Sequence, residues 1–209
     1  MSRPVLYGFP LSSATARVRT TLELKGVDYE FRLVDLRAGA HREPNYLRDV
    51  NPQGQVPALV IDGHTLSQSI SICEYLDETR PEPRLMPEQP RERARCRQLV
   101  ELINSGIQPL QNLGVIRHLV EVTGAEPQRK EWPQYWIRRG FAALESLLGD
   151  SAGKYCVGDM VTLADVVLAP QVRGARIYGV EMTEFPGIAR IDAALNQIEA
   201  FRAGLSTTA

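Results

Sequence analysis

Apolar and polar positions follow two different spacings in the first part of the chain. The run PVLYGF is typical of a buried strand, and the helical spacing after it ends at Gly26, where glycine favours a helix C-terminus. VDYEFRLVDL then alternates with a period of two, and VPALVIDGHTLSQS contains two strand-like runs joined by the turn signal Asp62-Gly63. Helical spacing returns in SISICEYLDETR. This order predicts an α/β domain, a small mixed sheet with helices packed on it.

Only helical patterns follow in the rest of the chain. The stretch PEPRLMPEQP, residues 81–90, carries four prolines and predicts a linker, because proline interrupts helices and removes backbone donors. Beyond it apolar residues recur at helical spacing, with one interruption at Pro109. We therefore predict an α/β domain over 1–80, a linker over 81–90 and an all-helical domain over 91–209.

Composition and charge argue against several classes of function. The formal net charge is −1 and the isoelectric point is about 6.3, so we expect no binding of nucleic acid or of an anionic membrane. No apolar run approaches the ~20 residues of a membrane span. The three cysteines are far apart and form no metal-binding spacing with the three histidines. We therefore expect no metal site and a reducing, cytoplasmic location.

Two serines, Ser12 and Ser13, stand where the first strand gives way to a helix. One interpretation is structural, because serine is a good N-cap residue. The other is chemical: a hydroxyl at a helix N-terminus can hold a thiolate, which both the donor and the helix dipole favour. Arg17 and Arg19 follow on the same helix, and they either add positive potential or form structural pairs.

Two later positions also carry a structural and a functional interpretation. Pro57 either simply starts a strand or forms a cis bond with Val56, which would turn the Val56 N–H and C=O outward to pair with an extended peptide. Gln68 and Ser69 fall where a strand ends and a helix begins. A serine there is a helix cap or a site for a ligand carboxylate, to which Gln68 can add hydrogen bonds.

Taken together, these positions and several longer motifs resemble the glutathione transferases. The resemblance runs over nearly the whole chain and is closest to the zeta class, which includes maleylacetoacetate isomerase. The motifs that carry it are SSATARVR, LKGVDYE, NPQGQVPAL, SGIQPLQNL, YCVGDMVTLADVVLAPQV and FPGI. It implies a thioredoxin-like N-terminal domain, an all-helical C-terminal domain, glutathione as cofactor, a small electrophilic substrate and a homodimer.

The resemblance also implies roles for individual residues. Ser12 matches the serine that hydrogen-bonds the sulfur of glutathione, and Ser13 is a supporting donor or cap. Residues expected to contact the rest of glutathione are His41, Gln55, Val56, Pro57, Gln68 and Ser69. Gln108 and Asn112, four apart on one predicted helix face, are expected to line the cleft between the domains. Asp165, three residues after Thr162, is expected to cap a helix.

Three positions depart from the class pattern and bear on the substrate. Ala14 replaces the class cysteine, Leu11 replaces an arginine before the serine pair, and Ile177 falls where a second arginine is expected. Arg176, one position away, points about 100° round the helix. The resemblance implies a cis–trans isomerase acting on an electron-poor conjugated alkene. The alternatives are a transferase that conjugates or dehalogenates small electrophiles, and a glutathione-binding protein without turnover. Thiol exchange is disfavoured, because no cysteine lies near Ser12.

Overall fold

A computed structural model describes residues 3–207 and divides the chain into two compact units. The first unit comprises the chain up to Leu85 together with the segment that starts at Ile198, and the second runs from Met86 to Gln197. No helix or strand lies between Thr79 and Pro90, so the stretch predicted as a linker, 81–90, has no regular element until Pro90 begins α4.

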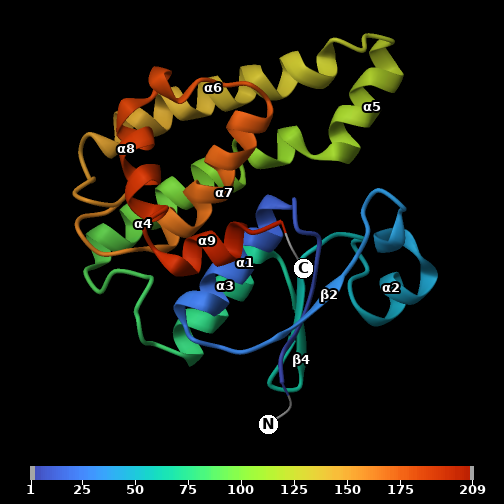
Figure 1. Ribbon diagram of the computed structural model, residues 1–209, viewed down its shortest axis with the longest axis horizontal. Helices are drawn as coiled ribbons and strands as arrows, with labels where there is room; N and C mark the ends of the chain where they lie inside the picture. Colours follow the sequence, from blue (N-terminus) through green and yellow to red (C-terminus); the bar gives the residue numbers. More distant parts are fainter. Residues whose placement is uncertain (1–2, 208–209) are drawn as a thin grey trace. The chain divides into compact units, whose positions relative to one another are not determined.

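The first unit is a four-stranded mixed sheet with helices, in agreement with the predicted α/β fold. Its sheet has the order β2-β1-β3-β4, with β2 parallel to β1 and the other neighbours antiparallel. In Figure 1, α1 and α3 lie together on one side of this sheet, and α2 lies on the other. Its elements are β1 (Val5–Gly8), α1 (Ser13–Leu24), β2 (Glu30–Leu33), η1 (Ala40–Arg42), α2 (Pro44–Asp49), β3 (Ala58–Ile61), β4 (His64–Ser67), α3 (Ser69–Thr79) and α9 (Glu199–Leu205).

Two predicted local signals determine how these elements begin and end. Gly26 has φ +61°, and its N–H donates to Glu23 O at 3.1 Å while Val27 N–H donates to Leu22 O at 3.0 Å. These are the two bonds of a Schellman C-cap. Asp62 and Gly63 both have positive φ and join β3 directly to β4, as a two-residue hairpin turn requires.

The last helix corrects the predicted domain 91–209 at its C-terminal end. Helix α9 packs against α1 within the first unit, with Phe201 buried. Gly204 makes the close approach possible, because a Cβ atom there would lie 2.7 Å from the Thr20 backbone nitrogen. Helical spacing alone predicts that α9 is a helix and not which helix it contacts.

The second unit is helical, as predicted. No strand is assigned among its described residues. Its elements are α4 (Pro90–Asn104), η2 (Gln108–Gln111), α5 (Leu113–Thr123), α6 (Gln128–Leu148), α7 (Leu163–Ile177), η3 (Met182–Glu184) and α8 (Pro186–Leu195).

The predicted structural role of Asp165 is confirmed. Its carboxylate accepts hydrogen bonds from Thr162 N–H at 2.8 Å, from Thr162 Oγ1 at 2.8 Å and from Cys156 N–H at 2.9 Å. With Thr162 it forms the capping box of α7. Burial raises the pKa of Asp165, and these hydrogen bonds oppose that shift.

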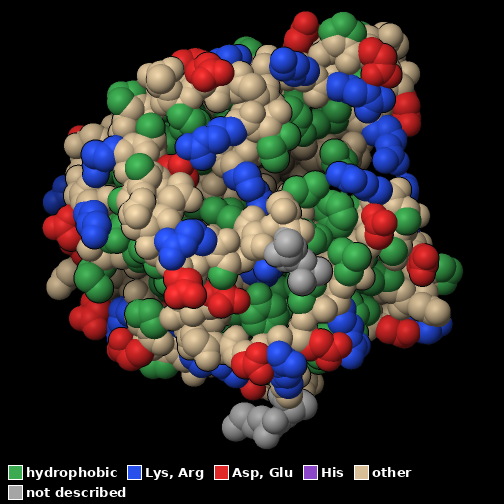
Figure 2. All heavy atoms as spheres, in the orientation of Figure 1, with side chains coloured by type: hydrophobic (Ala, Val, Ile, Leu, Met, Phe, Trp, Pro, Cys, Tyr) green, Lys and Arg blue, Asp and Glu red, His purple; other side chains and the backbone are tan. Residues whose placement is uncertain are grey.

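Charged side chains of both signs are mixed over the face drawn in Figure 2, in keeping with the small net charge. None of the helices described in residues 3–207 is both long and apolar enough to cross a membrane.

Candidate functional site

The strand register brings three of the predicted segments to one end of the sheet. Tyr7 near the end of β1 pairs with Ala58 at the start of β3, and Ala58 pairs with Ser67 at the end of β4. The loop leading to Ser12, the Val56–Pro57 step and the Gln68–Ser69 step all adjoin these paired residues. Positions far apart in the sequence therefore meet at this end of the sheet.

Ser12 is the N-cap of α1, and its hydroxyl can still donate a hydrogen bond. Its Oγ accepts a hydrogen bond from Thr15 N–H at 3.2 Å, and its backbone N–H donates to Phe9 O at 2.9 Å. A hydroxyl has two acceptor lone pairs and one hydrogen, so capping leaves that hydrogen available. The first turn of α1 carries no acidic residue, so nothing there offsets the positive end of the helix. The structural and chemical interpretations of Ser12 are therefore compatible.

The neighbours of Ser12 present little charge. Ser13 is the first residue of α1 and is partly exposed, as is Ala14. Leu11 is 41 % exposed. An apolar side chain thus stands beside the hydroxyl at the position where the class pattern has an arginine.

The loop before β3 leaves the backbone N–H and C=O of one residue, Val56, without partners in residues 3–207. The Val56–Pro57 bond is cis, as the functional interpretation requires. The C=O of Gln55 accepts from Tyr46 Oη at 2.7 Å and from Asn51 Nδ2 at 2.8 Å, which fixes the backbone on the N-terminal side of Val56. In the described part of the chain, neither the N–H nor the C=O of Val56 has a hydrogen-bond partner. Both groups are therefore available to hydrogen-bond with an extended peptide.

Tyr46 and Asn51, which hold this loop, are not among the predicted site residues. Both are buried, and burial raises the pKa of Tyr46 to about 12, so its hydroxyl stays protonated and donates. Asn51 also accepts from Gln53 N–H at 3.1 Å. The one local signal was the turn composition of NPQGQ, which predicts a loop without naming its partners.

The Gln68–Ser69 step is the third component of the site. Gln68 has φ +69°, a backbone conformation that is uncommon for a residue with a side chain and that clusters at functional sites. Its Nε2 donates to Gln53 Oε1 at 2.7 Å, which connects this step with the loop before β3. Ser69 opens α3, and its Oγ accepts from Nη1 of the buried Arg17 at 3.2 Å.

The two arginines of α1 prove to be structurally engaged. Arg19 donates to Ser206 O at 2.7 Å and lies with its guanidinium 5.3 Å from the Phe31 ring centre. His41 lies on η1, and its carbonyl oxygen would be 3.1 Å from a Cβ atom at Gly54. His41 thus lies beside the loop that carries Gln55 and Val56.

The predicted residues of the second unit differ from expectation. Gln108 and Asn112 are not four apart on an α-helix face, because Pro109 makes the segment a 3₁₀ turn and Asn112 caps α5. Gln108 Nε2 and Asn112 Oδ1 lie 3.5 Å apart. Arg176 donates to Asp192 Oδ2 at 2.7 Å. This pairing favours a structural role for Arg176 over substrate binding.

Neither the cysteines nor a metal cluster supplies a second reactive centre in the described residues. All three cysteines are buried and free, and burial raises the pKa of Cys73 to about 12 and that of Cys96 to about 11. No group of acidic, histidine or cysteine side chains in residues 3–207 has the arrangement of a metal site.

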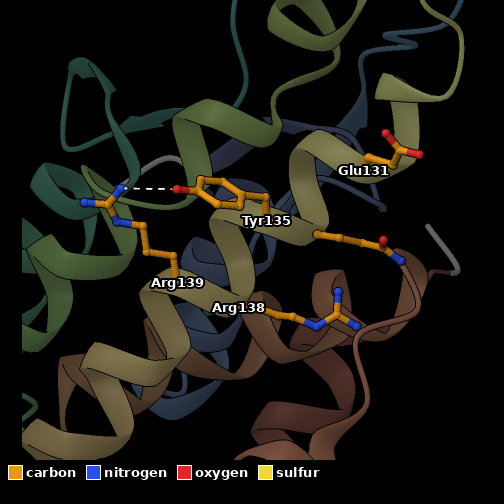
Figure 3. Close-up of a pocket in the computed structure, with 5 residues that line it drawn as sticks. Glu131, Tyr135, Arg138 and Arg139 are labelled. Atoms are coloured by element: carbon orange, nitrogen blue, oxygen red, sulfur yellow. Dashed lines mark hydrogen bonds between the residues drawn. The ribbon is translucent and has the colours of Figure 1, made fainter.

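An open hollow of about 500 Å³ lies elsewhere, along one face of α6. Figure 3 shows Tyr135 and Arg139 together on one side and Glu131 and Arg138 on the other. Arg138 Nε lies 3.1 Å from Glu184 Oε2, and Arg139 Nη1 lies 3.5 Å from Tyr135 Oη. None of the predicted site residues lines this hollow, and its arginines are already engaged.

Two family models match the chain. "Glutathione S-transferase, N-terminal domain" matches residues 4–78, and "Glutathione S-transferase, C-terminal domain" matches residues 126–203. Among similar proteins, maleylacetoacetate isomerase of Rattus norvegicus is 49% identical over 201 residues, which cover 96% of this chain and 91% of that protein. Probable maleylacetoacetate isomerase 2 of Drosophila melanogaster is 48% identical, with 96% and 87% covered.

Solved structures similar to this chain also include zeta-class glutathione S-transferases and maleylacetoacetate isomerases. A bacterial maleyl pyruvate isomerase, a zeta-class glutathione S-transferase in its holo form, superposes with a TM-score of 0.94 at 37% identity, covering 98% of each chain. Maleylacetoacetate isomerase of Anaeromyxobacter dehalogenans 2CP-1, with glutathione in its active site, superposes with a TM-score of 0.87 at 42% identity, covering 96% of this chain and 94% of that one.

Proposed function

The chain belongs to the glutathione S-transferase family, and from this premise we propose that it is a glutathione-dependent cis–trans isomerase of the zeta type. Its substrate is a small electrophile with a cis double bond conjugated to a carbonyl group. The observation that carries the proposal is the meeting of Ser12, Val56 and Ser69 at one end of the sheet.

The donor set at this sheet end fits the chemical groups of a tripeptide thiol. The Ser12 hydroxyl and the N-terminus of α1 match a thiolate. The unpaired N–H and C=O of Val56 match a peptide group. The Ser69 hydroxyl at the N-terminus of α3 matches a carboxylate. Three different groups of one ligand therefore have suitable partners.

When bound, glutathione supplies a thiolate that adds reversibly to the alkene, so that the double bond becomes single, rotates and re-forms as the thiolate leaves. The role of Ser12 is to donate a hydrogen bond to the sulfur, which stabilises the thiolate form of glutathione. A free thiol has a pKa of about 8.5, and only the ionised form is a useful nucleophile. Ser13 supports this donor.

The remaining glutathione contacts follow the loops around Ser12. Gln55 and Pro57 flank Val56 in the loop before β3, and Gln68 adds side-chain hydrogen bonds near Ser69. His41 lies against the same loop and is proposed as an outer contact. Gln108 and Asn112 stay predictions for substrate binding.

One observation favours a second function, conjugation of apolar electrophiles. Leu11 is 41 % exposed beside Ser12, and Arg176 is held by Asp192, so neither position offers a free cation to a diacid. A relative named glutathione S-transferase 1, from Dianthus caryophyllus, is 42% identical. If the adduct of glutathione and the electrophile does not expel glutathione, it is a conjugate. If a halide leaves the electrophile instead, the enzyme is a dehalogenase.

A substrate panel distinguishes these functions. Cis-enones, maleyl diacids and haloacids are each incubated with and without glutathione, using the native protein and Ser12→Ala. The proposal expects isomerised enone with glutathione only, and a large loss in the variant. Turnover without glutathione, or an unaffected variant, contradicts it. Accumulated conjugate or released halide supports the second function.

We further propose a homodimer and a cytoplasmic location. The first rests on the resemblance to the zeta class. The second is supported by three buried, unpaired thiols, which suit a reducing compartment.

A further inference from the structure

Arg17 is a wholly buried cation, 0 % exposed, on a helix that also carries the proposed thiolate donor. Burying a guanidinium is costly unless hydrogen bonds satisfy it. Its Nη1 donates to Ser69 Oγ at 3.2 Å, and this bond joins α1 to the first residue of α3 across 52 positions of sequence. Arg17 therefore connects α1 to the N-terminus of α3, and both helices contribute to the site.

This bond orients the Ser69 hydroxyl. An oxygen that accepts from a guanidinium must point its own hydrogen elsewhere, because the hydroxyl carries one hydrogen and two lone pairs. The hydrogen that remains is also a stronger donor, since neighbouring hydrogen bonds polarise one another. At the N-terminus of α3 such a donor joins backbone N–H groups that already favour an anion.

A second cross-link makes this geometry rigid. Thr21 Oγ1 donates to Arg17 O at 2.9 Å and lies 3.1 Å from Cys73 Sγ of α3. Arg17 is four residues after Ser13, so both lie on one face of α1. The guanidinium is thus placed by the helix pair and not by a flexible loop.

We infer that Arg17 is a positioning residue for glutathione, holding the Ser69 hydroxyl with its hydrogen directed to a carboxylate of the tripeptide. This inference rests on the proposed function. Arg17 itself contacts Ser69 and is not assigned a contact with glutathione. Its effect should therefore disappear when the Ser69 hydroxyl is removed.

A double-mutant cycle tests this coupling by calorimetric titration with glutathione. Arg17→Met and Ser69→Ala should each raise the dissociation constant roughly tenfold, the loss of one hydrogen bond of moderate strength. The double variant should bind about as weakly as either single variant. Arg17→Lys, which retains a buried donor, should recover part of the affinity. Gly204→Ala is the control for stability: its Cβ would meet the Thr20 backbone, so it should lower the unfolding midpoint and leave the dissociation constant unchanged.

The outcomes separate this inference from the function on which it rests. If the native protein does not bind glutathione, the proposed function fails. If it binds and the two single losses multiply in the double variant, the positioning role of Arg17 is wrong. If Arg17→Met does not fold, Arg17→Lys with Ser69→Ala forms the same cycle, and multiplying losses there overturn the inference equally.

Discussion

Replacing Ser12 by alanine should change two quantities that can be measured separately. Ser12 caps α1 through Thr15 N–H at 3.2 Å, and it is the proposed donor to the glutathione sulfur. Loss of a serine cap costs about 1 kcal/mol of stability, whereas replacement by glycine costs only a few tenths. Ser12→Gly therefore removes the hydroxyl while nearly preserving the helix.

The expected effect on the thiol follows from the same bond. A hydrogen bond to a charged group contributes about 1.5–3 kcal/mol, and one pKa unit corresponds to about 1.36 kcal/mol. Without the Ser12 hydroxyl the pKa of bound glutathione should therefore rise by roughly one to two units. The dipole of α1 remains in both variants, so the shift need not reach the pKa of the free thiol.

The assay is a pH titration of the ultraviolet thiolate absorbance of enzyme-bound glutathione, with unfolding free energies from denaturant titration in parallel. Ser12→Ala and Ser12→Gly should show the same pKa increase and different stability losses. If the increase follows the stability loss instead, helix integrity and not the hydroxyl controls the thiol. A bound pKa that is identical in the native protein and both variants refutes the reasoning.

Three further predictions concern the structure around the site. Arg176→Met should cost about 1–3 kcal/mol in denaturant titration because it leaves the Asp192 carboxylate, 3 % exposed, without its ion pair; an unchanged midpoint, or a loss of catalysis in a stable variant, contradicts a structural role. Gly204→Ala should lower the unfolding free energy by about 1–3 kcal/mol. The Cβ would meet the Thr20 backbone, which cannot move aside, and this outweighs the helix propensity gained; equal or higher stability contradicts the α1–α9 packing. The cysteines should not react with a thiol reagent near neutral pH until the protein unfolds, since burial raises the pKa of Cys73 to about 12; rapid labelling of native protein contradicts this burial.

Local chemistry made much of the fold predictable. The Gly26 cap, the Asp62-Gly63 turn and the Ser12 cap each depend on a few adjacent residues, and each is present in the structure. The interruption at Pro109 was also recognised, although its result, a 3₁₀ turn, displaced Gln108 from the helix face on which it was expected.

Long-range pairings could not be predicted in the same way. The sequence left open whether Arg17 adds positive potential or forms a structural pair, and the partner that it has in the structure, Ser69, is 52 residues away. The helical spacing near the C-terminal end carries no information that Thr20 of α1 is a contact of α9. The pairing of Arg176 with Asp192 likewise depends on how α7 and α8 pack. Each of these contacts joins elements that are distant in the sequence, so it depends on the tertiary structure and not on local pattern.

Proton NMR of a cis-enone with glutathione far below the substrate concentration tests the central claim most directly. The account predicts that many molecules of trans product form for each molecule of glutathione, and that the free thiol is undiminished at the end. Conversion that stops after one product per glutathione, or that proceeds equally well in its absence, would contradict it.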